Sequence, residues 1–116
     1  MEYHSAFHLI SGILKKTGIS CVLIGGFAVN YYKFSRQSAD VDFLITEYDF
    51  NKIKNYLRQA GYTQDSEKKV FARLRNKRPG FLDIDFMFVD KDTLDKIMLD
   101  AKEVAIAKYR FLIPSL

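Results

Sequence analysis

The stretch that decides the fold runs from Val22 to Ile45 and reads VLIGGFAVNYYKFSRQSADVDFLI. It begins as an apolar run, ends that run on the pair Gly25-Gly26, and returns to apolar residues in the segment DVDFLI at 40–45. Aspartate is depleted from β-strands, yet two aspartates stand inside this second apolar run. Because a local preference broken without structural gain is expected at functional sites, these carboxylates are the first candidates for function.

The two aspartates have counterparts in a later apolar segment. Side chains two residues apart on a strand point to the same face, about 7 Å apart along the chain, so Asp40 and Asp42 share one face. The segment FLDIDFMFV repeats this spacing with Asp83 and Asp85. If the two strands are neighbours, three or four carboxylates gather together, and such groups raise one another's pKa or bind a cation. Hard oxygen ligands select Mg²⁺ or Mn²⁺, the ions of phosphoryl transfer.

The glycine pair supplies the complementary chemistry. Gly25 and Gly26 lie where the apolar run CVLI gives way to FAVNYYKF, a segment typical of a short helix. Glycine lets a phosphate approach the backbone, and free N–H groups at a helix N-terminus favour an anion. A lone Asp-x-Asp or a lone Gly-Gly is a weak signal. Their conjunction with a distant acidic strand predicts a site for a metal-bound triphosphate.

The composition indicates one folded domain. The chain has 116 residues, 48% of them hydrophobic and 15% aromatic, which suffices for a core and is too apolar for a disordered chain. A balance of 18 basic and 14 acidic residues gives a net charge of +4, which permits a nucleotide or nucleic acid partner. A single cysteine, Cys21, excludes a disulfide framework. Without a signal-like N-terminus or a long apolar run, we expect a cytoplasmic protein that spans no membrane.

Hydrophobic periodicity predicts the order α-β-α-β-α-β-β-α-β, which corresponds to an α/β (α+β) fold with a mixed, twisted sheet flanked by helices. Helices are expected over 4–16, 27–34, 47–62 and 91–104, and strands over 21–24, 40–45, 68–75, 81–89 and 104–116. The segment NKRPG at 76–80 joins two of these strands as a hairpin, so a purely parallel sheet is excluded.

Three segments together resemble the nucleotidyltransferase superfamily that shares its fold with DNA polymerase beta. LIGGFAV is similar to the glycine motif of that family, RQSADVDFLI to its paired acidic motif, and LDIDFMF to its third acidic strand. The run from Arg36 to Asp42 looks most like a small bacterial branch that includes abortive-infection toxins. The resemblance spans roughly residues 5 to 113. It implies a single minimal domain over 1–116 that lacks the C-terminal helical extension of relatives.

The resemblance also implies roles for the motif residues. Asp40, Asp42 and Asp85 would be the catalytic carboxylates and would bind two Mg²⁺ ions, with Asp85 near the attacking hydroxyl. Gly25 and Gly26 would hold the triphosphate, although many relatives have Gly-Ser where this chain has Gly-Gly. The reaction would move a nucleotidyl group from an NTP to a hydroxyl of RNA (such as tRNA), of a protein or of a small molecule, with release of pyrophosphate.

Further residues near the motifs have two interpretations each. Arg36 and Ser38 precede the acidic pair, where they would orient a phosphate or serve as a loop arginine and a capping serine. Asp83 competes with Asp85 as the third carboxylate, and we favour Asp85 because it lies deeper in the apolar run. His4 and His8 have metal-ligand spacing on a helix, but no acidic partner is evident nearby, so ordinary helix histidines are expected.

The hairpin segment KKVFARLRNKRPG carries a concentration of basic residues: Lys68, Lys69, Arg73, Arg75, Lys77 and Arg78. Arg73 and Arg75 share one strand face, so the basic residues can form a stripe beside the acidic site. Such a stripe suits a triphosphate or RNA substrate, whereas a charge-rich hairpin that only keeps a sheet edge soluble is the plainer interpretation.

Three functions from different classes fit these observations. The leading hypothesis is a metal-dependent nucleotidyltransferase. A second is a non-catalytic binding module on the same fold, such as one half of a toxin–antitoxin pair with a protein partner, which the short C-terminus favours. A third is a plain α+β domain with solvent-facing aspartates, which leaves the matched facing of four strand aspartates to coincidence. Metal-dependent binding of an NTP separates the first from the other two.

Overall fold

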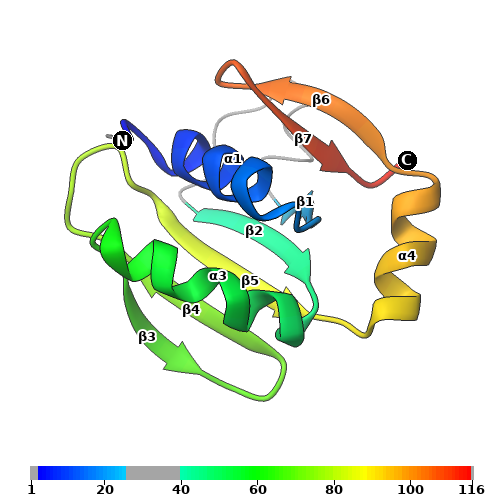
Figure 1. The fold of residues 1–116 in the computed structure, drawn as a ribbon, viewed down its shortest axis with the longest axis horizontal. Coiled ribbons are helices and arrows are strands. Elements are labelled where there is room, and N and C mark those ends of the chain that lie inside the picture. Colours follow the sequence, from blue (N-terminus) through cyan, green and yellow to red (C-terminus); the bar gives the residue numbers. More distant parts are fainter. Residues whose placement is uncertain (1–2, 26–39, 116) are drawn as a thin grey trace.

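The computed structural model describes residues 3–25 and 40–115, which form a mixed sheet with helices packed against it (Figure 1). The helices are α1 (Ala6–Thr17), α3 (Glu47–Gln59) and α4 (Lys91–Leu99). The strands are β1 (Val22–Ile24), β2 (Asp40–Ile45), β3 (Thr63–Glu67), β4 (Phe71–Arg75), β5 (Asp83–Phe88), β6 (Lys102–Ile106) and β7 (Tyr109–Ile113). Their order in the sheet is β3-β4-β5-β2-β1-β7-β6, which confirms the predicted mixed α/β architecture.

The alternation of polar and apolar residues in DVDFLI explains why β2 lies inside the sheet. Val41, Phe43 and Ile45 are buried, whereas the residues between them are only partly buried. β2 pairs in parallel with β5 and antiparallel with β1. The rings of Phe43 and Phe86, which are register partners on β2 and β5, stack with centroids 5.7 Å apart. One face of this strand pair therefore belongs to the core, and the other carries the aspartates.

Two helices cover the core face of the sheet, and Figure 1 shows α1 and α3 on the same side. α1 is capped by Ser5 before its first residue and by Gly18 after its last residue. The left-handed backbone of Gly18 (φ 73°) lets its N–H donate to the carbonyl of Leu14. α3 begins at Thr46, whose hydroxyl accepts from the backbone N–H of Asp49. Both helices turn apolar side chains toward the sheet, so the aspartate-bearing face is the opposite one.

The structure differs from the sequence-based expectation in three places. β3 was not predicted, and the helix expected over 91–104 ends at Leu99 because the following residues pair as β6 with β7. The tail expected as one strand is a hairpin that turns at Ala107 and Lys108, both with positive φ (52° and 77°). The helix expected over 27–34 lies outside the described residues. Within the described residues, no helix has the length and apolar character needed to cross a membrane.

Candidate active site

The four strand aspartates lie side by side because β2 and β5 are parallel neighbours in register. Asp40 is the register partner of Asp83, and Asp42 is the register partner of Asp85. All four are only partly buried, whereas the residues between them belong to the core. The face shared by Asp40 and Asp42 is therefore also the face of Asp83 and Asp85. From the sequence, this juxtaposition could be predicted only on the condition that the two strands are neighbours.

Asp42 has the most strongly perturbed carboxyl group of the cluster. Burial is the main cause that raises the pKa of Asp42 to about 6, followed by the charges of Asp85 and Asp40 and a hydrogen bond with the Asp85 carboxyl. The positive charge of Arg73 acts in the opposite direction but does not cancel these effects. In the absence of a bound cation, this cluster therefore retains a proton more readily than separate aspartates do.

Gly25 places the backbone directly against Asp42. The residue before it, Ile24, is the register partner of Asp42 across β1 and β2, and Gly25 adopts a positive φ of 76°. A Cβ atom built on Gly25 would overlap the carboxylate of Asp42. Glycine is therefore needed here for its backbone conformation and for the close approach of the carboxylate. Gly26, by contrast, lies outside the described residues, as do Arg36 and Ser38.

Arg73 contacts a particular carboxylate, and the sequence analysis did not predict this contact. It lies on β4 directly across from Asp85 in the antiparallel pairing of β4 with β5. Its Nε donates to Oδ1 of Asp85 at 2.7 Å and its Nη2 to Oδ2 at 2.9 Å, so both oxygens of the carboxylate are engaged. The contact raises the pKa of Arg73 above its usual range, which keeps the guanidinium charged.

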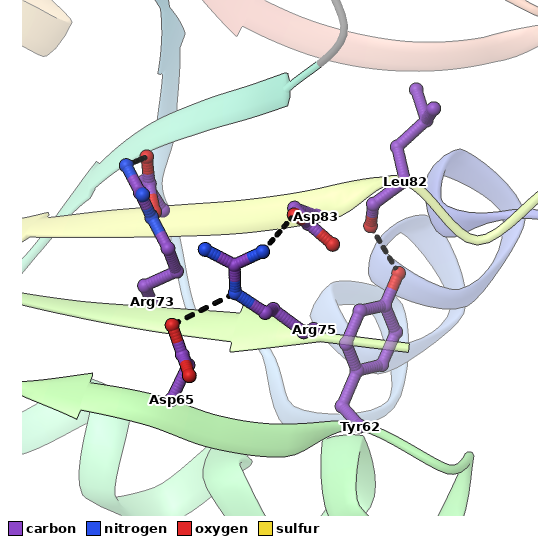
Figure 2. Close-up of polar contacts among 7 residues, drawn as sticks. Tyr62, Asp65, Arg73, Arg75, Leu82 and Asp83 are labelled. Carbon is purple, nitrogen blue, oxygen red and sulfur yellow. Dashed lines mark hydrogen bonds and ion pairs between the residues drawn. The ribbon is translucent and has the colours of Figure 1, made fainter. Parts of the chain in front are cut away.

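A second arginine on the same face of β4 contacts the outer aspartates. Figure 2 shows Arg75 between Asp65 of β3 and Asp83 of β5, with Nε 2.8 Å from Asp65 Oδ2 and Nη1 3.4 Å from Asp83 Oδ2. Two members of the predicted basic stripe, Arg73 and Arg75, thus lie beside the acidic cluster. In the same view Tyr62, which follows α3, donates its hydroxyl to the carbonyl of Leu82 at 2.7 Å and ties that region to the start of β5.

The chemistry of the cluster fits a hard divalent cation, but its geometry is not that of an assembled metal site. Carboxylate oxygens are the ligands that Mg²⁺ and Mn²⁺ prefer. Within residues 3–25 and 40–115, however, no three His, Cys, Asp or Glu side chains are placed so that they could hold one metal ion. The ion pair with Arg73 engages both oxygens of Asp85 in this arrangement.

Other candidate features lie away from the cluster. His8 lies in α1, whereas His4 precedes the N-cap Ser5 and is outside the helix that was expected to carry both histidines. Their rings stack with centroids 5.5 Å apart, and the backbone N–H of His4 donates to His8 Nδ1. A hollow of about 890 Å³ is lined by Thr17 to Ser20 and by the first turns of α3 and α4. It lies where β2 and β5 end, whereas Asp40 and Asp83 lie where those strands begin.

Comparison with known proteins places these motifs in a wider group. The family model described as "Uncharacterised nucleotidyltransferase" matches residues 2–116. No curated protein sequence matches the chain closely enough to serve as a relative. The sequence match therefore comes from the family model, and it covers both the glycine turn and the four aspartates.

Solved structures share the fold at low sequence identity. The lincosamide antibiotic adenylyltransferase LnuA, bound to lincomycin, has a TM-score of 0.69 and 14% identity, and the match covers 91% of this chain and 76% of LnuA. ANT(2″)-Ia in complex with adenylyl-2″-tobramycin has a TM-score of 0.69 and 14% identity, covering 93% of this chain and 66% of that protein. A tRNA nucleotidyltransferase with a primer tRNA and an ATP analogue has a TM-score of 0.52 and 21% identity, covering 72% and 24%.

Proposed function

The chain belongs to the uncharacterised nucleotidyltransferase family, and we propose that it transfers a nucleotidyl group from an NTP to a hydroxyl acceptor with release of pyrophosphate. The observation that supports this most directly is the register of β2 with β5, which brings Asp42 beside Asp85 and Asp40 beside Asp83. Four carboxylates on one sheet face, next to a glycine turn, suit the binding of a metal-bound triphosphate.

Asp40, Asp42 and Asp85 are the residues that we propose as ligands of Mg²⁺ or Mn²⁺. When bound, the metal would neutralise the carboxylates and the charge that develops on the substrate phosphates. The pKa of Asp42 is raised first by burial and then by the charges of Asp85 and Asp40, and a divalent cation would balance these charges, which supports the assignment. Asp83 lies at the start of β5 and Asp85 deeper in the strand, so we assign the third ligand to Asp85 and a supporting role to Asp83.

The proposed reaction is a displacement at the α-phosphorus of the NTP. The acceptor oxygen forms a bond to that phosphorus while the bond to the bridging oxygen of the β-phosphate breaks, and pyrophosphate leaves with the bonding electrons. The acceptor hydroxyl gives its proton to the carboxylate of Asp85, which acts as a general base. This role requires that an oxygen of Asp85 be released from Arg73.

The glycine turn is the proposed binding site for the triphosphate. Gly25 brings the turn directly beside the Asp42 carboxylate, so a triphosphate held by the backbone of this turn would lie next to the proposed metal ligands. Gly26, Arg36 and Ser38 complete this site in our proposal on the strength of the family motif alone. They lie outside the described residues.

We propose that the acceptor is a compound with a hydroxyl group. A screen of candidate acceptors can identify its chemical class. The structural neighbours are associated with lincomycin, with adenylyl-2″-tobramycin and with a primer tRNA. A lincosamide, an aminoglycoside and a tRNA are therefore the first acceptors to test, and a protein hydroxyl completes the set.

A non-catalytic module on the same fold is the second candidate, and one observation favours it. The Arg73 guanidinium engages both oxygens of Asp85, so the protein itself already pairs one carboxylate of the cluster with a positive charge. A module of this kind, for example one half of a toxin–antitoxin pair, would bind a protein partner and would not require an NTP.

Calorimetric titration of each NTP, with and without Mg²⁺, tests the enzyme proposal. We expect one or more NTPs to bind only with Mg²⁺, and binding to weaken at least about tenfold in Asp42→Asn. Asp65→Asn is the matched control, because it removes the same charge from the edge strand β3, away from β2, and should bind like the parent protein. No binding of any NTP by the parent protein would instead favour the non-catalytic module.

A further inference from the structure

The ion pair between Arg73 and Asp85 is fixed by the backbone. The two residues face each other across β4 and β5, and the guanidinium places one nitrogen on each carboxylate oxygen, at 2.7 and 2.9 Å. This two-pronged contact is the geometry that arginine makes best and lysine cannot reproduce. The Asp85 side chain is only 13% exposed, so the ion pair is largely shielded from water.

A divalent cation at Asp85 would meet this guanidinium at close range. The metal needs a carboxylate oxygen that Arg73 already engages, and two positive charges beside one carboxylate repel each other. The contact with Arg73 and full metal coordination at Asp85 are therefore competing states.

We propose that Arg73 is an internal counter-ion that occupies the third metal ligand in the metal-free protein and gives it up when the metal binds. This inference rests on the proposed function, because it assumes that Asp85 is a metal ligand. Arg73 is then a positioning residue that sets how tightly the bare protein holds a metal. It offsets part of the negative charge of the carboxylate cluster until a metal-bound substrate arrives.

The released guanidinium has one obvious new partner. The neighbouring carboxylates Asp65 and Asp83 already contact Arg75, at 2.8 and 3.4 Å. The Arg73 side chain is 38% exposed, so it can turn toward the open face of the sheet. An incoming triphosphate supplies oxygens of the kind that a guanidinium binds with two N–H groups. The ion pair of Arg73 with Asp85 would thus be replaced by two contacts, one from Asp85 to the metal and one from Arg73 to the triphosphate.

The inference is tested by the affinity of the full chain for Mn²⁺ alone, measured from the electron paramagnetic resonance signal of free Mn²⁺. We expect Arg73→Gln to bind Mn²⁺ about tenfold more tightly than the parent protein. Arg75→Gln is the matched control, since it removes the same charge from the same face of β4 but leaves Asp85 untouched, and it should change the affinity less than about twofold. Arg73→Lys keeps the charge but loses the two-pronged contact and should fall between.

The outcomes separate this inference from the proposed function. Equal affinities of the parent protein and Arg73→Gln, with binding abolished by Asp42→Asn, would overturn the role of Arg73 and leave the metal site standing. Absence of Mn²⁺ binding in every variant, with folding verified by thermal unfolding, would overturn both. A second measurement needs no substitution: the Nε–H resonance of Arg73 should shift on addition of Mg²⁺, whereas that of Arg75 should not, and an unmoved Arg73 resonance at saturating Mg²⁺ would contradict the exchange.

Discussion

Ionisation of Asp42 lowers the stability of the folded protein. Its pKa in the folded protein is raised to about 6, so the folded state holds the proton more tightly than the unfolded chain does. The sign follows: in a metal-free buffer, stability is greater below the unfolded pKa and falls as pH rises through about 6. Asp42→Asn removes this loss and should raise the free energy of unfolding at pH 8 by about 1 kcal/mol, a value reduced by solvent screening.

Urea unfolding in EDTA at pH 4 and pH 8 measures this effect. The stabilisation by Asp42→Asn should be near zero at pH 4 and appear at pH 8. Asp65→Asn is the control, because it breaks an exposed ion pair with Arg75 and should be neutral or destabilising at pH 8. A pH-independent difference between Asp42→Asn and the parent protein would contradict the assignment of charge repulsion to Asp42.

Gly25 is the second residue whose role can be isolated. Alanine there is penalised by the positive φ and by overlap with the Asp42 carboxylate, so we expect a loss of about 2 kcal/mol or more and loss of NTP binding. Gly18→Ala separates the two causes, since Gly18 has a similar φ of 73° but no atom within 4 Å of the added Cβ. It should cost about 1 kcal/mol and leave NTP binding intact. Equal losses in both variants, measured by urea unfolding and calorimetry, would remove the argument for close approach at Gly25.

At the scale of elements, one hydroxyl joins the end of α3 to the start of β5. Tyr62 is buried and donates to the carbonyl of Leu82 at 2.7 Å. Tyr62→Phe keeps the packing but leaves that carbonyl without its donor, so we expect a loss of about 1–2 kcal/mol in thermal or urea unfolding. Tyr48→Phe is the control, because Tyr48 is 71% exposed and its hydroxyl is free to bond with water. A Tyr62→Phe variant as stable as the control would show that water replaces the bond.

The elements also show what the sequence can and cannot predict. β2 and the helix after it are predicted well because DVDFLI alternates strictly and the helix has a regular apolar stripe. β3 reads TQDSE, with no apolar alternation, and it forms because an edge strand needs pairing on one side only. The final hairpin is missed because Ala107 and Lys108 occupy turn positions that usually require glycine or asparagine.

The site could be predicted from the sequence to about the same extent as the fold. Shared faces follow from spacing within a strand, so Asp40 with Asp42 and Arg73 with Arg75 were identified as same-face pairs. Which strands are neighbours, and in which register, depends on long-range packing that one sequence does not reveal. The ion pair of Arg73 with Asp85 is set by that register and was therefore not predicted as a specific contact.

For the whole molecule, the buried thiol of Cys21 reports opening of the fold. It lies just before β1, in the core, and burial raises the pKa of Cys21 to about 12. Native protein at pH 8 should therefore react with a thiol reagent about a thousandfold more slowly than unfolded protein, at a rate set by transient opening. Gly25→Ala should accelerate labelling, and Gly18→Ala less so. Fast labelling of the native parent protein would contradict the burial of this thiol.

The parallel pairing of β7 with β1 has a consequence for how the chain assembles. β1 carries Gly25 into the site, and its two neighbours are β2, which comes soon after it, and β7, which comes near the end of the described chain. During synthesis, one edge of β1 stays unpaired until β7 (Tyr109–Ile113) has left the ribosome, because β7 is made long after β1. Contacts this distant in sequence also form late in folding. A β6–β7 hairpin supplied by a second chain would satisfy that edge equally well. Refolding at high concentration therefore favours exchange of this hairpin between molecules, whereas dilution favours the closed monomer.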